Sequence, residues 1–347
     1  MIAPVFVPPV LVPPVWVPPV WVPPVFVPLV MVPLVMVPLP PETVHLPFES
    51  GPYRMAMGLV AAPESAWFEI DALYPAEMAE RRRLLAFRRA EVCGGGPGPD
   101  AARAETLDMV LDNLTRTHPG WFARIGEIIV NRLTGERLTI AAYDPLELAG
   151  RLVQEDLCLI EASPEGPRLT SAVLCFPSRW RLREKLGCPL AAVHGAVPLY
   201  AERLARPVDR FMTHLKPGPV VTRLNWSMLD DPTLFQPTGK WRTAHDATIT
   251  AGNAGERLFL RVERQSLRRL PDSGAVLFGI RVHVYRLDRA VADRDTAARL
   301  AAAVRALPDS IAHYKSLPMF RAALLGWLDR RAAASAFVEA DPGQASR

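Results

Sequence analysis

Residues 261–287, which read RVERQSLRRLPDSGAVLFGIRVHVYRL, contain six arginines. Five of them form the cluster of interest: Arg261, Arg264, Arg268, Arg269 and Arg281. Apolar runs flank the turn-like sequence PDSG, and this pattern predicts a β-hairpin. Guanidinium groups bind carboxylates and phosphates through paired hydrogen bonds. The cluster therefore predicts either an anionic ligand held on a sheet or a solvated strand face paired with neighbouring acids.

His194 is a candidate ligand for a haem iron. It lies between the apolar residues AAV and the small residues GAVP. A haem needs one imidazole nitrogen and a large apolar cavity, and small neighbours leave room for a flat macrocycle. The alternative is an ordinary histidine of the core or of a loop. Phe176, Trp180, Trp226 and Trp241 could line such a pocket, although aromatic side chains also fill cores by default.

Other metal and redox motifs are absent from the sequence. None of the seven histidines is paired with another at i, i+4, so a zinc site on one helix is not expected. His283 falls in the polar phase of its strand and is expected to face solvent. The four cysteines show no CxxC spacing, which argues against a zinc ribbon, an iron–sulfur cluster or a disulfide scaffold. A reducing cytoplasm is the expected location.

The charge balance excludes a strongly basic nucleic-acid-binding protein. The 40 basic residues are nearly matched by 36 acidic residues, which gives a net charge of +4. No GxGxxG, GxxxxGK[ST], GxSxG or HExxH sequence occurs. Nucleotide-binding loops and the common hydrolase motifs are therefore not expected. Only four of the basic residues are lysines: Lys185, Lys216, Lys240 and Lys315.

The elements that position these residues can be read from hydrophobic periodicity. Helices are expected in residues 75–90, 101–116, 144–153, 180–186, 199–215, 291–307 and 314–337. Strands are expected in residues 128–130, 138–140, 156–162, 169–176 and 220–226, followed by the arginine-rich hairpin. Asp144 before a proline predicts a capped helix start. The simplest architecture is one α+β domain in residues 41–335, with an antiparallel sheet and helices on one of its faces.

The N-terminus is a low-complexity arm, residues 1–40, in which pentapeptides such as PVWVP repeat. The proline density is incompatible with a membrane-spanning helix, and no basic residue precedes the run as in a secretory signal. Extended, polyproline-like or disordered structure is expected. A docking arm for a partner with aromatic grooves is the alternative. A disordered tail is expected in residues 336–347.

Four sequence blocks resemble one known family. They are CFPSRWRLREKLG at 175–187, AVHGAVP at 192–198, RLNWSM at 223–228 and LRVERQSLRRLPDSGAVLFGIRVHVY at 260–285. In order and spacing they are similar to the haem-dependent oxidative N-demethylase family, in particular to its haem-binding α subunit, the large subunit of dimethylamine monooxygenase. The resemblance extends over residues 41–328.

The resemblance implies a PAS-like antiparallel sheet with flanking helices that holds haem b through a histidine. It also implies an O2-dependent, NADPH-driven oxidation of a small secondary amine to a primary amine and formaldehyde. Electrons would come from reductase partner subunits that carry FMN and a [2Fe–2S] cluster. This chain has no motif for either centre, which agrees with a subunit that carries haem alone.

The residues of the implied site follow from these blocks. His194 matches the histidine of the family's block and is the expected axial ligand, with Cys175 as the alternative. Trp226 would contact the cofactor.

The charged residues of the same blocks have two implied roles. Arg223, Arg264 or Arg268 would bind the haem propionates. Glu263 or Asp230 would pair with the ammonium form of the amine, because a buried cation requires a counter-charge.

Two other classes of protein remain open at this point. One is a PAS-like haem sensor or non-catalytic haem protein, and the other is a haem-free scaffold that kept the fold. The chain shows no appended output domain, which argues against a sensor.

Overall fold

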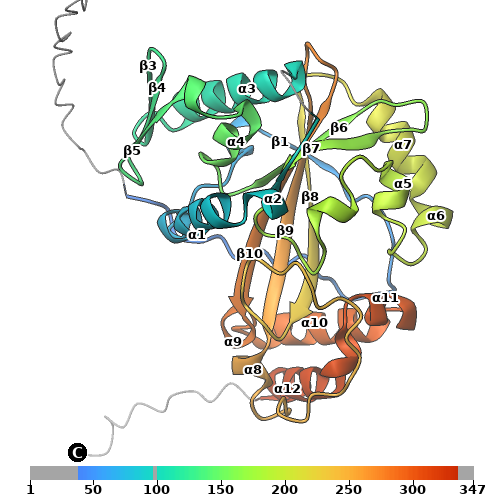
Figure 1. The fold of residues 1–347 in the computed structure, drawn as a ribbon. Helices are drawn as coiled ribbons and strands as arrows, with labels where there is room; N and C mark the ends of the chain where they lie inside the picture. The colour runs from blue at the N-terminus through green and yellow to red at the C-terminus, as the bar shows by residue number, and fades with distance from the viewer. Residues whose placement is uncertain (1–37, 97–99, 335–347) are drawn as a thin grey trace, which may run out of the picture. The chain divides into compact units, whose positions relative to one another are not determined.

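The computed structural model describes residues 38–96 and 100–334 (Figure 1). The arm predicted in residues 1–40 lies outside these residues except for positions 38–40. The predicted tail, residues 336–347, also lies outside them. Among the described residues, no helix is long and apolar enough to cross a membrane.

A seven-stranded sheet forms the centre of the fold, with the strand order β1-β8-β9-β10-β6-β7-β2 and antiparallel pairing throughout. The arginine-rich hairpin is confirmed as β9 and β10, which pair along their full length from Arg269 opposite Val276 to Phe259 opposite Arg286. The strands are β1 (Val60–Ala62), β2 (Cys93–Gly94), β6 (Asp156–Glu161), β7 (Arg168–Val173), β8 (Val220–Leu229), β9 (Phe259–Arg269) and β10 (Val276–Arg286).

A second, three-stranded sheet contains β3 (Phe122–Ile125), β4 (Ile128–Asn131) and β5 (Glu136–Thr139). The last two strands are the hairpin expected from residues 128–140. With the central sheet and the helices, this confirms an α+β fold built on a large antiparallel sheet.

The long helices largely follow the sequence periodicity. As expected, the Asp144 carboxylate caps α4 by accepting from the backbone N–H groups of Leu146 and Glu147. The described helices are α1 (Tyr74–Phe87), α2 (Arg89–Val92), α3 (Ala101–Thr117), α4 (Pro145–Gly150), α5 (Leu190–Val193), α6 (Tyr200–Arg203), α7 (Ala205–His214), α8 (Ala254–Arg257), α9 (Leu287–Ala290), α10 (Arg294–Ala306), α11 (Asp309–Tyr314) and α12 (Arg321–Ala333).

Three helix predictions are only partly right. The helix expected in residues 199–215 is divided at Leu204 into α6 and α7. The one expected in residues 180–186 is a single 3₁₀ turn, Leu182–Glu184. The last helix begins only at Arg321, because a 3₁₀ turn containing Pro318 precedes it.

Helices cover both faces of the sheet, so the expectation of helices on one face is wrong (Figure 1). Val262 of β9 belongs to an apolar cluster with Leu300 of α10. Leu267, at the opposite phase of the same strand, belongs to a cluster with Met212 of α7. Because side chains alternate along a strand, these two clusters lie on opposite faces.

The hairpin arginines are mostly buried and bonded within the protein. Arg261 is fully buried and donates to the Phe176 carbonyl at 2.6 Å. Arg281 is equally buried and forms ion pairs with Asp71 at 2.8 Å and Glu77 at 2.7 Å. Such side chains connect the sheet to neighbouring segments. Neither a solvated strand face nor a shared anion site describes this cluster.

Gly255 marks a close approach of α8 and α12, and its replacement by alanine is expected to destabilise the protein. A Cβ atom at this position would lie 2.6 Å from Nε1 of Trp327. Overpacking of this kind costs about 1–3 kcal/mol of unfolding free energy, which urea denaturation would measure. Gly96→Ala is the control, since a Cβ there meets no atom within 4 Å. Equal losses in both variants would contradict the prediction.

Candidate functional site

A cavity of about 1070 Å³ is bordered by the central sheet and by α5, α6 and α7. Arg223 and Asn225 of β8 lie opposite Gln265 and Glu263 of β9, respectively, so all four side chains share one face of the sheet. All four line the cavity. Its volume is at the upper end of the range for cofactor and ligand pockets, which is about 300–1,000 Å³.

Much of the cavity wall is apolar. The sheet contributes side chains from β6, β9 and β10, and the helices contribute the facing side. These residues are Cys158, Ile160, Leu267, Phe278, Ile280, Leu190, Val193, Val208, Phe211 and Met212. An apolar wall of this size suits a flat, mostly hydrocarbon cofactor.

His194 lies at the end of α5 and lines the cavity. Its Nδ1 is 2.9 Å from the Leu190 carbonyl oxygen. A carbonyl only accepts hydrogen bonds, so Nδ1 carries the proton and Nε2 keeps its lone pair. The Tyr200 ring stacks on the imidazole at 4.5 Å between centroids. Burial lowers the pKa of His194 to about 4, so the imidazole is neutral and able to bind a metal.

Three of the four lysines of the chain line this cavity: Lys185, Lys240 and Lys315. Burial lowers the pKa of Lys315 to about 8 and that of Lys185 to about 8. Arg223 of β8 also lines the cavity. A group of buried cations of this kind favours a ligand with negative charge.

Glu263 is an acid within this cationic cavity. It accepts from Gln265 Nε2 at 3.0 Å and from Asn225 Nδ2 at 3.4 Å. Arg261 Nε is 3.9 Å from its other carboxylate oxygen. Among the residues that the structure describes, Glu49 is the other acid that lines the cavity. Two amides therefore hold one oxygen of the Glu263 carboxylate, and a guanidinium lies beside the other.

Arg264 and Arg268 do not line the cavity, contrary to their expected proximity to a cofactor. Arg264 pairs with Glu69 at 3.1 Å, and Arg268 pairs with Glu64 at 3.1 Å. Even-numbered positions of β9 face away from Glu263 because side chains alternate along a strand. Nearness in sequence therefore grouped residues that the sheet separates.

Asp230 is also outside the residues that line the cavity. Its two carboxylate oxygens are bound by Arg179 at 2.6 Å and by Arg242 at 2.8 Å. Because two guanidinium groups already neutralise the single negative charge of Asp230, this carboxylate is not expected to pair with an ammonium ion.

The aromatic residues divide between the cavity and the surface. Phe176, Trp180 and Trp226 line the cavity as expected, and the Trp226 ring lies 5.5 Å from Lys315 Nζ. Trp241 does not line it and is 49% exposed. The cavity wall therefore includes three large aromatic side chains, one of them from β8.

Cys175, the alternative ligand, is buried and does not line the cavity. Burial raises the pKa of its thiol to about 12, so it does not supply a thiolate near neutral pH.

A family model described as haem-dependent oxidative N-demethylase, alpha subunit-like, matches residues 58–325. The chain belongs to this family. The matched residues include His194, Glu263, Arg223 and the cavity lysines. Membership in the family of haem-dependent oxidative N-demethylase α-subunit-like proteins indicates an oxidative, haem-dependent activity. It also indicates a chain that works with other subunits.

Sequence reasoning missed the cavity lysines and two amides, Asn225 and Gln265. The lysines had a detectable signal, since a chain that uses arginine almost throughout keeps four lysines and three of them are in one cavity. The amides had none, because only strand pairing places them beside Glu263.

Proposed function

We propose that this chain binds haem b in the cavity and demethylates a small secondary amine of the dimethylamine type. The products are a primary amine and formaldehyde, and the oxidant is O2. Reductase subunits with FMN and a [2Fe–2S] cluster supply electrons from NADPH. The observation that carries the proposal is His194, a neutral imidazole with a free Nε2 in the wall of a large, cation-rich cavity.

The residues present fit a haem. His194 would hold the haem through Nε2, and the Leu190 carbonyl fixes the orientation of its ring as outer partners of ligating histidines do. Arg223 and the lysines Lys185, Lys240 and Lys315 supply the positive charge that two propionates require. In this proposal these four residues bind the propionates in place of Arg264 and Arg268, which lie on the opposite face of the sheet. When bound, the haem supplies the iron that binds and activates O2.

Glu263 binds the amine in this proposal. A secondary amine is protonated near neutral pH, and a cation in a cavity rich in lysine requires a nearby carboxylate. Asn225 and Gln265 hold that carboxylate in place. In the net reaction, two electrons, two protons and O2 convert the N-methyl group to formaldehyde, with one oxygen atom released as water.

The central antiparallel sheet with helices around a cofactor cavity supports a PAS-like arrangement. All four cysteines are free thiols, which supports a reducing, cytoplasmic location.

The test is formaldehyde release by the full chain, loaded with haem and supplied with dimethylamine and a reductase or chemical electron donor. Glu263→Gln is expected to lower turnover at least about tenfold, because the ammonium ion loses its counter-charge. The Soret band of the Glu263→Gln variant should match that of the parent protein. Glu49→Gln, at the other acid of the cavity, is the matched control and should retain activity.

The outcomes separate the classes of protein. A Soret band without formaldehyde would identify a non-catalytic haem protein or sensor. No Soret band after reconstitution would identify a haem-free scaffold and overturn the proposal.

A further inference from the structure

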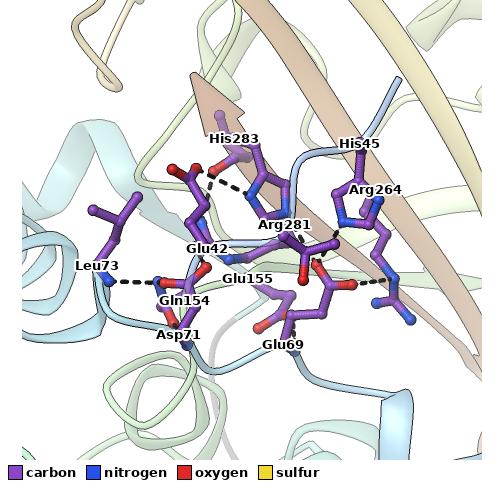
Figure 2. A network of polar contacts seen from close by, with 12 residues as sticks. Glu42, His45, Glu69, Asp71, Leu73, Gln154, Glu155, Arg264, Arg281 and His283 are labelled. Carbon is purple, nitrogen blue, oxygen red and sulfur yellow. Dashed lines mark hydrogen bonds and ion pairs between the residues drawn. The ribbon is translucent and has the colours of Figure 1, made fainter. Parts of the chain in front are cut away.

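A second cluster of metal-binding side chains lies away from the cavity. Figure 2 shows His45, Glu69 and His283 directed toward one another. His45 precedes β1, Glu69 precedes α1 and His283 belongs to β10. Their three ligand atoms all lie within 4.8 Å of one another. None of the three residues lines the cavity that contains His194.

His283 was expected to face solvent, but its side chain is fully buried. Its position on β10 is opposite Val262, and that face of the sheet is covered by the segment that carries Glu42 and His45. The polar phase of this strand therefore faces a polar interior cluster.

The distances suit a divalent metal ion. Glu69 Oε2 is 3.0 Å from His283 Nε2 and 3.3 Å from His45 Nε2. Ligand atoms bound tetrahedrally to Zn²⁺ at about 2.0–2.1 Å are separated by about 3.3 Å. The ligand nitrogens of His45 and His283 lie within 4.8 Å of each other, so an ion bound by both would draw the two rings together. Two imidazoles and a carboxylate are donors that zinc-like ions prefer.

The surrounding contacts resemble those that orient metal ligands. His283 Nδ1 is 3.6 Å from Glu42 Oε1, and both buried atoms lack a hydrogen-bond partner. Glu69 Oε1 is held by Arg264 Nε at 3.1 Å, which leaves Oε2 for the ion. In metal sites a ligating histidine commonly contacts a carboxylate through its second nitrogen, and a ligating carboxylate commonly accepts a hydrogen bond through its second oxygen.

The cluster leaves one buried contact without a hydrogen bond. Both ring nitrogens of His283 face carboxylates, Glu42 and Glu69, and His283 Nδ1 and Glu42 Oε1 have no hydrogen-bond partner. Two carboxylates around one imidazole favour a bound cation, which is either a second proton on the ring or a metal ion. With a metal ion on Nε2, the single proton belongs on Nδ1 and faces Glu42. The His45 and Glu69 side chains are 16% and 23% exposed, which leaves an entry path and a position for water.

We propose that His45, Glu69 and His283 bind one divalent transition-metal ion of the zinc type, with Glu42 as a positioning residue. The ion joins the segment before β1 to the sheet. This site is independent of the haem cavity and of the proposed demethylation.

The experiment is a Zn²⁺ titration of the full chain, purified without a histidine tag and treated with a chelator. Elemental analysis should find one Zn²⁺ per chain, and the midpoint of thermal unfolding should rise with Zn²⁺. His45→Gln should weaken Zn²⁺ binding by about 100-fold or more, and Glu42→Gln by about tenfold. His313→Gln, at an exposed histidine, is the matched control and should bind as the parent protein does.

No Zn²⁺ uptake by the parent protein would overturn the proposal, as would equal affinity in His45→Gln, which would place the ion on other groups such as the free thiols. If His45→Gln does not fold, the parent titration and Glu42→Gln still decide the question. The Soret band should be the same with and without Zn²⁺, so failure here is distinguishable from failure of the haem proposal.

Discussion

The His194→Ala variant is expected to lose stable haem binding and all formaldehyde production. His194 is the imidazole in the cavity wall, and the Leu190 carbonyl already fixes its tautomer. Alanine removes the only nitrogen ligand proposed for the iron and leaves the apolar walls intact. Residual haem should therefore show altered ferric and ferrous–CO spectra.

Two additions make this experiment decisive. Imidazole added to the variant should enter the space left by the side chain and restore part of the original spectrum. His214→Ala, at an exposed histidine of α7, is the matched control and should keep its haem. Unchanged spectra in His194→Ala would show that another residue binds the iron.

The Arg281→Met variant is expected to lose about 3–5 kcal/mol of unfolding free energy, as when one partner of a buried ion pair is removed. Arg281 is fully buried between Asp71 and Glu77, at 2.8 and 2.7 Å. Methionine fills the space of the aliphatic stem but leaves two carboxylates without their counter-charge. Urea denaturation would measure the loss. Arg286→Met, at an exposed position of the same strand, should change stability by less than about 0.5 kcal/mol.

The deficit of Arg281→Met should depend on pH. Burial already raises the pKa of Glu77 even though Arg281 opposes it. Without Arg281 the folded-state pKa rises further above the unfolded value. The folded variant then binds more protons than the unfolded chain, so its stability falls as pH rises. We expect a smaller deficit at pH 5 than at pH 8, and a pH-independent deficit would contradict this electrostatic explanation.

The two-residue period of β9 separates two chemical environments. Glu263 and Gln265 face the cavity, whereas Arg264 faces Glu69 and the cluster shown in Figure 2. The proposed haem and zinc sites therefore use opposite faces of one sheet. A strand shifted by one residue would exchange them, and for this reason the register of the hairpin matters to both.

The sequence by itself determined the features that depend on local chemistry. The hairpin followed from apolar runs around PDSG, and the start of α4 followed from Asp144 before a proline, because turns and caps involve neighbouring residues. His194 was predicted as a haem ligand because small residues surround it in a block that resembles a family.

Only the tertiary structure decided which charged residues meet. Arg264 and Arg268 were grouped with Glu263 by position in the sequence, but strand alternation directs them to the opposite face. Lys185, Lys240 and Lys315 belong to separate segments that come together only around the cavity.

The cluster of His45, Glu69 and His283 shows the same limit most clearly. Its members are separated by 24 and 214 residues along the chain, and no local pattern connects them. The hydrophobic pattern fixes which elements form, because it acts over a few neighbouring residues. The meeting of side chains from distant segments depends on the pairing and packing of those elements, and that information becomes available only when the chain is folded.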